Sequence, residues 1–171
     1  MNNDLRIKMS VSDFDLIPKY DDPEYLTYNF EEKLIQPLYC SVKSKTDIIR
    51  IFLQMTDGQK FFFTFSEIHK EIYNGGIAQF CWNQIELKDF AIKTFEILND
   101  TLITSKYRVL LIDLENKSTK LKELKLKNDY AEFANYLNSN EFDDMFFKRV
   151  VYLQESMIKY IKDNKTQFIK D

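Results

Sequence analysis

Few residues in this chain can interrupt a helix, because glycine and proline occur only three times each among 171 residues. Two of the glycines, Gly75 and Gly76, are adjacent, and all three prolines lie before residue 38. Glycine and proline are the strongest local breaks in regular structure. Their distribution predicts an irregular segment over residues 1–36 and a regular remainder over residues 37–171.

Long hydrophobic runs are also missing. The longest purely apolar runs, such as residues 109–112, are far shorter than the roughly 18 residues that cross a bilayer. The first residues contain no apolar segment followed by a small-residue cleavage site, as a secretory signal would. We therefore expect a cytoplasmic protein with no membrane partner, in which Cys40 and Cys81 are reduced and buried.

The chain nevertheless contains enough apolar material for a substantial core. Hydrophobic residues make up 44% of it and aromatic residues 15%, with 15 Phe and 10 Tyr. This composition excludes a disordered chain, and the length suits one domain.

Apolar residues after Pro37 recur with the period of a helix. In one stripe, Phe61, Phe65, Ile68 and Ile72 are spaced 4, 3 and 4 residues apart. Similar patterns predict helices at 45–57 (ended by Gly58), 87–98, 101–115, 128–138 and 141–164. The predicted fold is an all-α, single-domain helical bundle of about seven helices, with residues 1–36 as an irregular, acidic N-terminal segment.

One short stretch has the alternation of a half-buried strand, with Leu5, Ile7, Met9 and Val11 separated by polar residues. A lone strand needs a partner. Three alternatives remain open: pairing with its copy in a homodimer, pairing with another N-terminal segment, or an extended tail.

The paired glycines lie in the stretch EIYNGGIAQFCWN, residues 71–83. A phosphate-binding loop would place glycines at wider, defined spacing after a strand, and here a helical stripe precedes them. An Asn at a helix end followed by Gly favours a helix that ends with Gly75 in the left-handed backbone conformation. Gly76 then permits a change in the direction of the chain. The pattern predicts a sharp corner between two packed helices and no nucleotide cofactor.

No catalytic constellation is visible. The only histidine, His69, is two residues from both Glu67 and Glu71, and residues i and i+2 of a helix do not share a face. Ser66 is three residues from His69 but lacks a turn motif that would expose a nucleophile. We expect no catalytic residues, no metal ligands and no cofactor, and therefore not an enzyme.

Charge is unevenly divided along the chain. Residues 1–36 contain eight acidic and four basic groups, so this segment carries −4, whereas the whole chain carries −3 and residues 37–171 carry +1. Such totals exclude a general affinity for nucleic acid. The lysine-rich run at 117–127 is interpreted as a solvated helix face or loop, with a polyanion site as the alternative.

Tyrosines among the N-terminal carboxylates suit a basic protein partner, because aromatic rings supply contact area and acids steer its approach. An alternative is that the tyrosines only pack this segment onto the core. The candidate partner-binding residues are Asp13, Asp15, Asp21, Asp22, Tyr25, Glu31 and Glu32.

The run E-x-x-N-G-G-x-x-Q-F-x-x-N resembles the hallmark motif of the bacterial DNA-mimic protein domain family. Here it consists of Glu71, Asn74, Gly75, Gly76, Gln79, Phe80 and Asn83. The segment at 142–164, with its acidic start and long amphipathic helix, is also similar to that family, so the resemblance covers roughly residues 45–168. It implies a small helical protein that sequesters a DNA-binding protein or transcription factor, with a namesake described as a dimer.

This sequence departs from the acidic character of that namesake. Duplex DNA carries one negative charge about every 1.7 Å of its axis, and a body of net charge +1 does not reproduce that density. The carboxylates would come from residues 1–36, joined by Glu141, Asp143 and Asp144. We expect a non-enzymatic protein-binding module whose partner is a basic DNA-binding protein. The alternative is an immunity protein that neutralises a cognate toxin.

Overall fold

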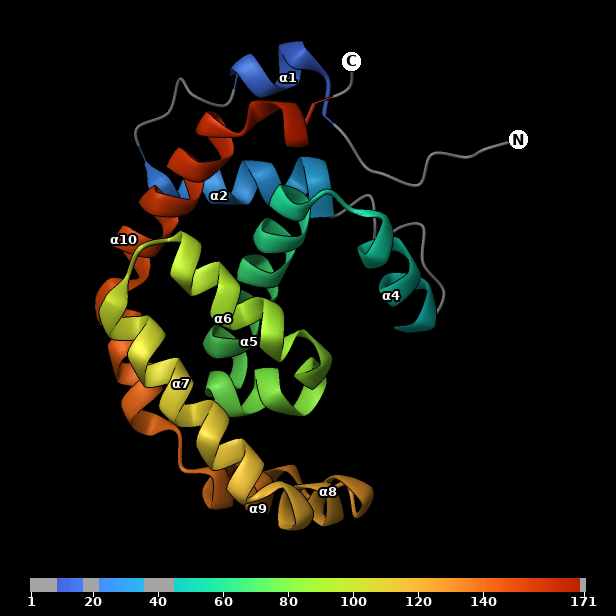
Figure 1. The fold of residues 1–171 in the computed structure, drawn as a ribbon, viewed down its shortest axis with the longest axis vertical. Helices are drawn as coiled ribbons and strands as arrows, with labels where there is room; N and C mark the ends of the chain where they lie inside the picture. Colours follow the sequence, from blue (N-terminus) through green and yellow to red (C-terminus); the bar gives the residue numbers. More distant parts are fainter. Residues whose placement is uncertain (1–8, 17–21, 36–44, 170–171) are drawn as a thin grey trace. The chain divides into compact units, whose positions relative to one another are not determined.

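The computed structural model describes residues 9–16, 22–35 and 45–169, and these residues form helices and connecting turns with no strand. The all-α prediction is confirmed. The chain divides into two compact units: residues 1–63 with 151–171, and residues 64–150. The divisions fall within two long helices, α5 (Asp57–Asn83) and α10 (Asn140–Asp163), which belong partly to each unit (Figure 1).

The first unit contains α1 (Val11–Leu16), α2 (Pro23–Phe30), a π-helical turn η2 (Glu31–Ile35), α4 (Lys45–Gln54), the start of α5, the end of α10 and η4 (Lys165–Gln167). Pro23 stands at the first position of α2, where its missing N–H costs no hydrogen bond. The Phe30 ring is fully buried, with the rings of Phe14 and Phe62 each 5.9 Å away in edge-on contacts. Aromatic packing therefore joins the N-terminal helices to α5 within this unit.

The N-terminal segment is more regular than the sequence predicted, since α1, α2 and η2 occupy much of what is described before residue 36. The strand pattern survives only as an isolated parallel bridge between Met9 and Ile169, in which Met9 N donates to Phe168 O at 2.8 Å. Leu5 and Ile7 lie outside the described residues, and Val11 begins α1. A C-terminal partner for Met9 was not among the predicted alternatives.

Gly58 does not end a helix, contrary to the sequence-based expectation. It lies in the first turn of α5, because Thr56 and Gln59 form a capping box: Thr56 N donates to Gln59 Oε1 at 3.0 Å and Gln59 N to Thr56 Oγ1 at 3.2 Å. The T-x-x-Q spacing of Thr56 and Gln59 is the sequence signal that would have predicted the start of a helix here. The N–H of Gly58 donates to Gln167 Oε1 at 2.5 Å.

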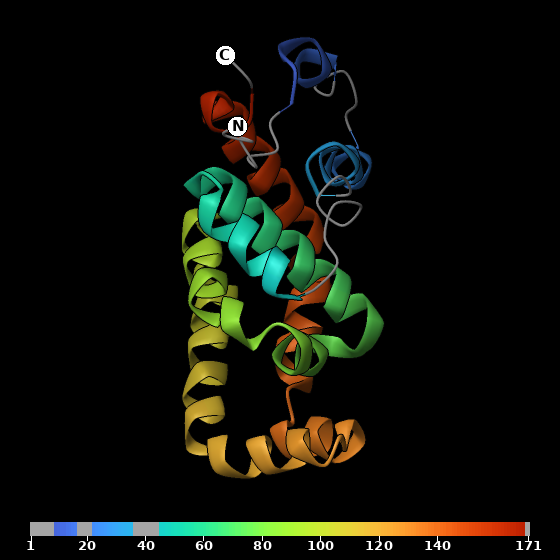
Figure 2. The ribbon, with the colours of Figure 1, turned by 90° about the vertical axis from the view of Figure 1, so that its right-hand side faces the viewer.

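The second unit contains the rest of α5 and the start of α10. Between them come η3 (Ile85–Leu87), α6 (Lys88–Ile97), α7 (Thr101–Asn116), α8 (Ser118–Leu126) and α9 (Tyr130–Leu137). These bounds confirm the helices predicted at 101–115, 128–138 and 141–164. In both ribbon views α7 runs alongside α6, and α9 lies against α8 (Figures 1 and 2).

Asparagines replace glycines as the stops between these helices. Asn99, Asn128 and Asn138 adopt left-handed backbone angles, with φ of 60°, 55° and 52°. The residue after two of them is the N-cap of the next helix: Asp100 accepts from Leu102 N and Ile103 N, and Asp129 accepts from Glu132 N. An Asn-Asp pair thus ends one helix and caps the next.

The core of the second unit is built from aromatic rings. Phe95, Tyr107 and Phe146 are fully buried, and the Phe95 and Tyr107 centroids lie 5.3 Å apart. Phe142 lies 5.7 Å from Tyr107 and 6.0 Å from Phe95, so that α6, α7 and α10 share one cluster. Edge-on and tilted ring pairs of this kind add to the stabilisation from buried area.

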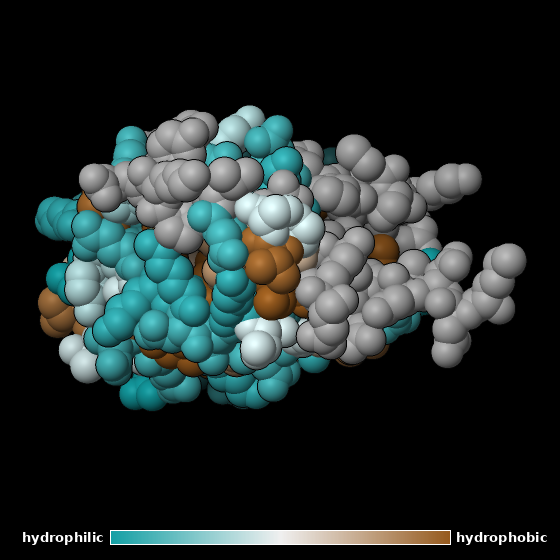
Figure 3. All heavy atoms as spheres, turned by 90° about the horizontal axis from the view of Figure 1, so that it is seen from above, coloured by the Kyte–Doolittle hydropathy of each residue, from teal (hydrophilic) through white to brown (hydrophobic). Residues whose placement is uncertain are grey.

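The face shown in Figure 3 is mostly hydrophilic where it is described, with hydrophobic residues in small groups. Scattered exposed apolar residues are normal in folded proteins. No helix among the described residues has the length and hydropathy to span a bilayer.

Candidate functional site

The glycine pair forms a corner within α5. Gly75 has φ −175° and ψ 25°, and Gly76 has φ 76° and ψ 178°, so neither residue is helical. Residues 64–74, here called the first arm, and residues 77–83, the second arm, therefore run in different directions. The predicted corner is confirmed, but the positive φ belongs to Gly76 and not to Gly75.

Buried carboxylates on the first arm accept hydrogen bonds from amides just beyond the corner. Asn83 Nδ2 donates to Glu71 Oε2 at 2.9 Å, and Gln84 Nε2 donates to Glu67 Oε2 at 2.8 Å. The side chains of Glu67 and Glu71 are one helical turn apart and almost fully buried. Charge-assisted bonds of this type are stronger than neutral ones. The Glu71–Asn83 pair therefore joins the two arms, and the Glu67–Gln84 pair joins the first arm to the residue that follows the second arm.

Two residues from distant helices hold the corner itself. Tyr130 of α9 donates its hydroxyl hydrogen to Gly75 O at 2.9 Å, and Ile77 N donates to Asp143 Oδ1 of α10 at 2.7 Å. Each partner satisfies a backbone group that the interruption of α5 would leave unpaired. A Cβ atom on Gly76 would overlap Asp143 Oδ2, so the carboxylate lies directly against the glycine backbone.

The remaining motif residues divide between core and surface. Phe80 is fully buried, and Gln79 is half-buried with its amide beside the Cα of Gly75. Asn74 is exposed, as is Gly75. Most of the motif therefore builds the corner, and Asn74 and Gly75 are its exposed residues.

Exposed aromatic rings flank the corner. Tyr73 is 56% exposed and Phe147 46% exposed, and their ring centroids lie 5.3 Å apart. His69 packs against Tyr73 at 4.7 Å and is half-buried. We call Tyr73, Phe147 and His69 the aromatic patch. No sequence pattern predicts this patch, because nothing in the chain pairs Tyr73 with a residue 74 positions later.

The corner is locally acidic. Burial raises the pKa of the half-buried Asp143, the hydrogen bond from Ile77 N opposes that rise, and the charge of Asp144 adds to it. Burial also raises the pKa of Tyr130, with further contributions from Asp143 and Glu71. Among the described residues, no lysine or arginine forms an ion pair with Asp143 or Asp144.

The N-terminal candidates are only partly described. Asp15, Asp22 and Glu32 are exposed, and Asp15 pairs with Lys165 at 2.5 Å. Glu31 is half-buried. The remaining candidates are Asp13 and Tyr25, of which only the helical backbone is described, and Asp21, which lies outside the described residues. Their gathering into one acidic surface stays a prediction.

The residues weighed for catalysis are dispersed. Glu67 and Glu71 point to amides, whereas His69 packs between aromatic rings, with Phe65 at 6.2 Å and Phe146 at 6.4 Å. Within the described part of the chain, no three His, Cys, Asp or Glu residues gather where a metal ion could bind.

Known proteins supply one point of comparison. A family model described as DMP19-like protein matches residues 53–164, which include the whole corner but not residues 1–36. No curated protein and no solved structure matches the chain.

Proposed function

The chain belongs to the DMP19-like protein family, and from this membership we propose that it is a non-enzymatic module that binds another protein. The proposed partner is a basic DNA-binding protein, such as a transcription factor, whose DNA-contacting surface the module occupies. The membership is the observation that carries the proposal, and the surface features of the corner support it.

The proposed contact surface is the corner with the aromatic patch, since the family match covers both. Tyr73, Asn74 and Phe147 are exposed there, and Asp144 adds an exposed carboxylate on the same turn of α10 as Phe147. Large aromatic side chains dominate binding energy at protein interfaces. A neighbouring carboxylate favours cationic partners and raises the rate of association.

The N-terminal acids have a second role in this proposal. Asp15, Asp22 and Glu32 are exposed and belong to the segment whose sequence carries −4. We propose that they steer a basic partner by long-range attraction, which decays over about 10 Å at 0.1 M salt. Competition with DNA should therefore weaken as salt increases.

The test begins with a DNA-binding protein captured from the source cell and purified. We expect the module to displace this protein from its DNA duplex in a fluorescence-anisotropy competition. The Tyr73→Ala/Phe147→Ala variant should compete at least about tenfold less well, because it removes two exposed anchors. The matched control is Val109→Ala/Ile112→Ala, which removes exposed apolar residues from α7.

Charge reversal tests the steering role separately. We expect Asp13→Lys, Asp15→Lys, Asp21→Lys and Asp22→Lys together to abolish competition. The control carries the same change in charge at exposed residues elsewhere: Glu86→Lys, Asp89→Lys, Glu115→Lys and Glu155→Lys. Equal competition by wild type and both charge variants would overturn the steering role. Suppression of a toxin's lethality, without displacement of DNA, would instead favour the immunity alternative.

A further inference from the structure

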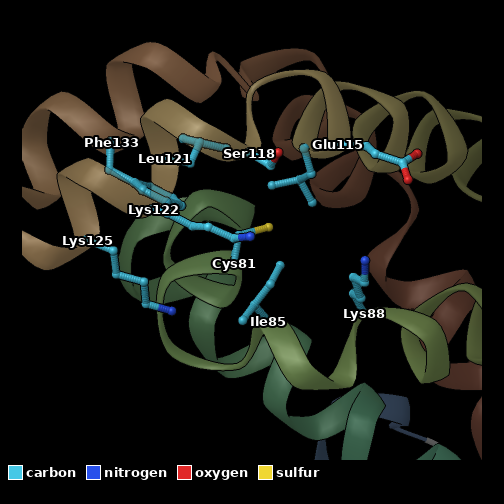
Figure 4. Close-up of a pocket in the computed structure, with 10 residues that line it drawn as sticks. Cys81, Ile85, Lys88, Glu115, Ser118, Leu121, Lys122, Lys125 and Phe133 are labelled. Atoms are coloured by element: carbon cyan, nitrogen blue, oxygen red, sulfur yellow. The ribbon is translucent and has the colours of Figure 1, made fainter.

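A second site lies in the same unit as the corner and includes Cys81 of the second arm. It is a pocket of about 250 Å³ between η3, α7, α8 and α9. Its walls are apolar, formed by Ile85, Leu114, Leu121 and Phe133, with Cys81 at the base. In Figure 4, Ile85 and Lys88 lie along the lower edge of the space, and Leu121, Ser118 and Glu115 lie along its upper edge.

Three lysines line the same pocket: Lys88, Lys122 and Lys125. The only acidic side chain in the lining is Glu115, and Ser118 adds a hydroxyl group. Lys88 and Lys122 form no ion pair with any carboxylate among the residues that the structure describes. The pocket thus combines an apolar interior with an excess of two positive charges.

The lysines on and beside α8 divide into two groups by their partners. Lys120 and Lys127 pair with Glu123 at 3.5 and 2.6 Å, away from the pocket lining. Lys122 and Lys125 line the pocket instead. Part of the lysine-rich run therefore lies beside an apolar space, and Lys122 is also exposed to solvent, as expected for a solvated helix face.

We propose that this pocket binds a small apolar carboxylate, such as a medium-chain fatty acid. Its hydrocarbon part would fill the space between Leu121 and Phe133, and its carboxylate would meet the lysines. A water molecule occupies about 30 Å³ in the liquid, so 250 Å³ corresponds to roughly eight waters and suits a ligand of about ten heavy atoms. Drug-sized ligands need about 300 Å³ or more.

Binding at this site is non-covalent. Burial raises the pKa of the Cys81 thiol to about 12, and Asp143 raises it further while Lys125 opposes the rise. The thiolate is the reactive form of cysteine. At neutral pH Cys81 is therefore an uncharged thiol that forms part of the apolar lining of the pocket.

The single tryptophan reports on the pocket. Trp82 adjoins Cys81 in the chain, and its ring lies 5.0 Å from that of Phe133, a wall residue. We expect a saturable change in Trp82 fluorescence when the full-length protein is titrated with octanoate. Uncharged 1-octanol should bind about tenfold more weakly, because it lacks the carboxylate.

Two variants separate the lysines from general effects of charge. Lys88→Gln/Lys122→Gln should weaken octanoate binding roughly five- to tenfold and leave 1-octanol binding unchanged. The control, Lys120→Gln/Lys127→Gln, removes the same amount of charge on and beside α8 but outside the pocket lining, and it should bind octanoate as wild type does. The proposal is overturned if octanoate gives no saturable change, or if the control weakens its binding as much as the pocket variant.

Discussion

At the scale of single residues, Gly76 has the least replaceable backbone in the corner. Its φ of 76° and ψ of 178° lie in a region that is essentially restricted to glycine. We predict that Gly76→Ala lowers the free energy of unfolding by about 2–4 kcal/mol, through backbone strain and overlap with Asp143. Chemical denaturation measures the loss.

Gly75 provides the matched control. Its φ of −175° is extended and open to any residue, and an added Cβ would meet the amide of Gln79 and the hydroxyl of Tyr130, which are both the far ends of side chains. Gly75→Ala should therefore cost less, about 1 kcal/mol or below. Equal losses in the two variants would contradict the assignment of the strained backbone to Gly76. The sequence could predict a corner but not which glycine has the positive φ, since either glycine tolerates it.

Asp143 should make stability depend on pH in a definite direction. Its pKa in the folded chain is raised above 3.8, chiefly by burial, so the folded state binds the proton more tightly than the unfolded state does. The contribution of Asp143 to the free energy of unfolding is then fully present below pH 3.8. It declines as the pH rises through the pKa that Asp143 has in the folded protein. Asp143→Asn keeps an oxygen for Ile77 N without the charge. We predict that the free energy of unfolding of Asp143→Asn equals that of wild type at low pH and is equal or higher at pH 7.

The contrasting variant is Asp143→Ala, which removes the acceptor of the Ile77 N–H. It should lose about 0.5–2 kcal/mol at both pH values, as when a helix cap is removed. The measurement is the free energy of unfolding from denaturant titrations at several pH values. If Asn at position 143 were destabilising at pH 7, the ionised carboxylate would be the stabilising form, and our assignment would be wrong.

At the scale of helices, the hydrogen bond between the side chains of Glu71 and Asn83 joins the two arms of α5. Glu71 is 5% exposed and accepts from Asn83 Nδ2 at 2.9 Å. We predict a coupling energy of about 1–2 kcal/mol in the double-mutant cycle of Glu71→Ala and Asn83→Ala, because each single change leaves a polar partner without its bond. A double-mutant cycle for Glu71 and the exposed Asn74 should show no coupling energy. Additive losses at Glu71 and Asn83 would mean that the motif spacing does not hold the arms together.

Helix positions were largely predictable from the sequence, because apolar residues on α6, α7, α9 and α10 follow the helical period without competing signals. The breaks between helices were harder to predict. Asn99 and Asn128 take the left-handed role that is usually sought at glycine, and each is followed by a capping Asp. The dipeptide Asn-Asp was therefore a readable signal.

The site was less predictable than the helices around it. The motif identified the corner, yet its supports, Tyr130 and Asp143, come from helices more than 50 residues away in the chain. Periodicity within one helix contains no information about contacts over that distance. The same limit hid the pairing of Tyr73 with Phe147.

At the scale of the whole molecule, charge is nearly balanced in each unit. Residues 1–63 with 151–171 carry 13 acidic and 12 basic groups, and residues 64–150 carry 14 and 12. Within the second unit many acids are paired with cations, as in Glu96 with Arg108 and Glu141 with Lys106. Any imitation of DNA must therefore depend on local groups of carboxylates, because neither unit has the charge of a nucleic acid.

The same balance predicts that the protein does not bind duplex DNA itself. The densest group of lysines, on and beside α8, is partly neutralised: Lys117 pairs with Asp113 at 3.5 Å, and Glu123 pairs with two further lysines. Too few cations remain to release the counterions on which affinity for DNA depends. We expect no retardation of a labelled duplex at about 0.15 M salt, and at most weak retardation at low salt.

Removal of the neutralising acids provides the control for this prediction. Asp113→Asn/Glu123→Gln frees Lys117, Lys120 and Lys127, and should increase retardation at low salt with a steeper dependence on salt concentration. Strong binding of DNA by the wild type at physiological salt would contradict the prediction. It would also argue against a module that competes with DNA, since one chain would then attract both the basic partner and the nucleic acid that this partner binds.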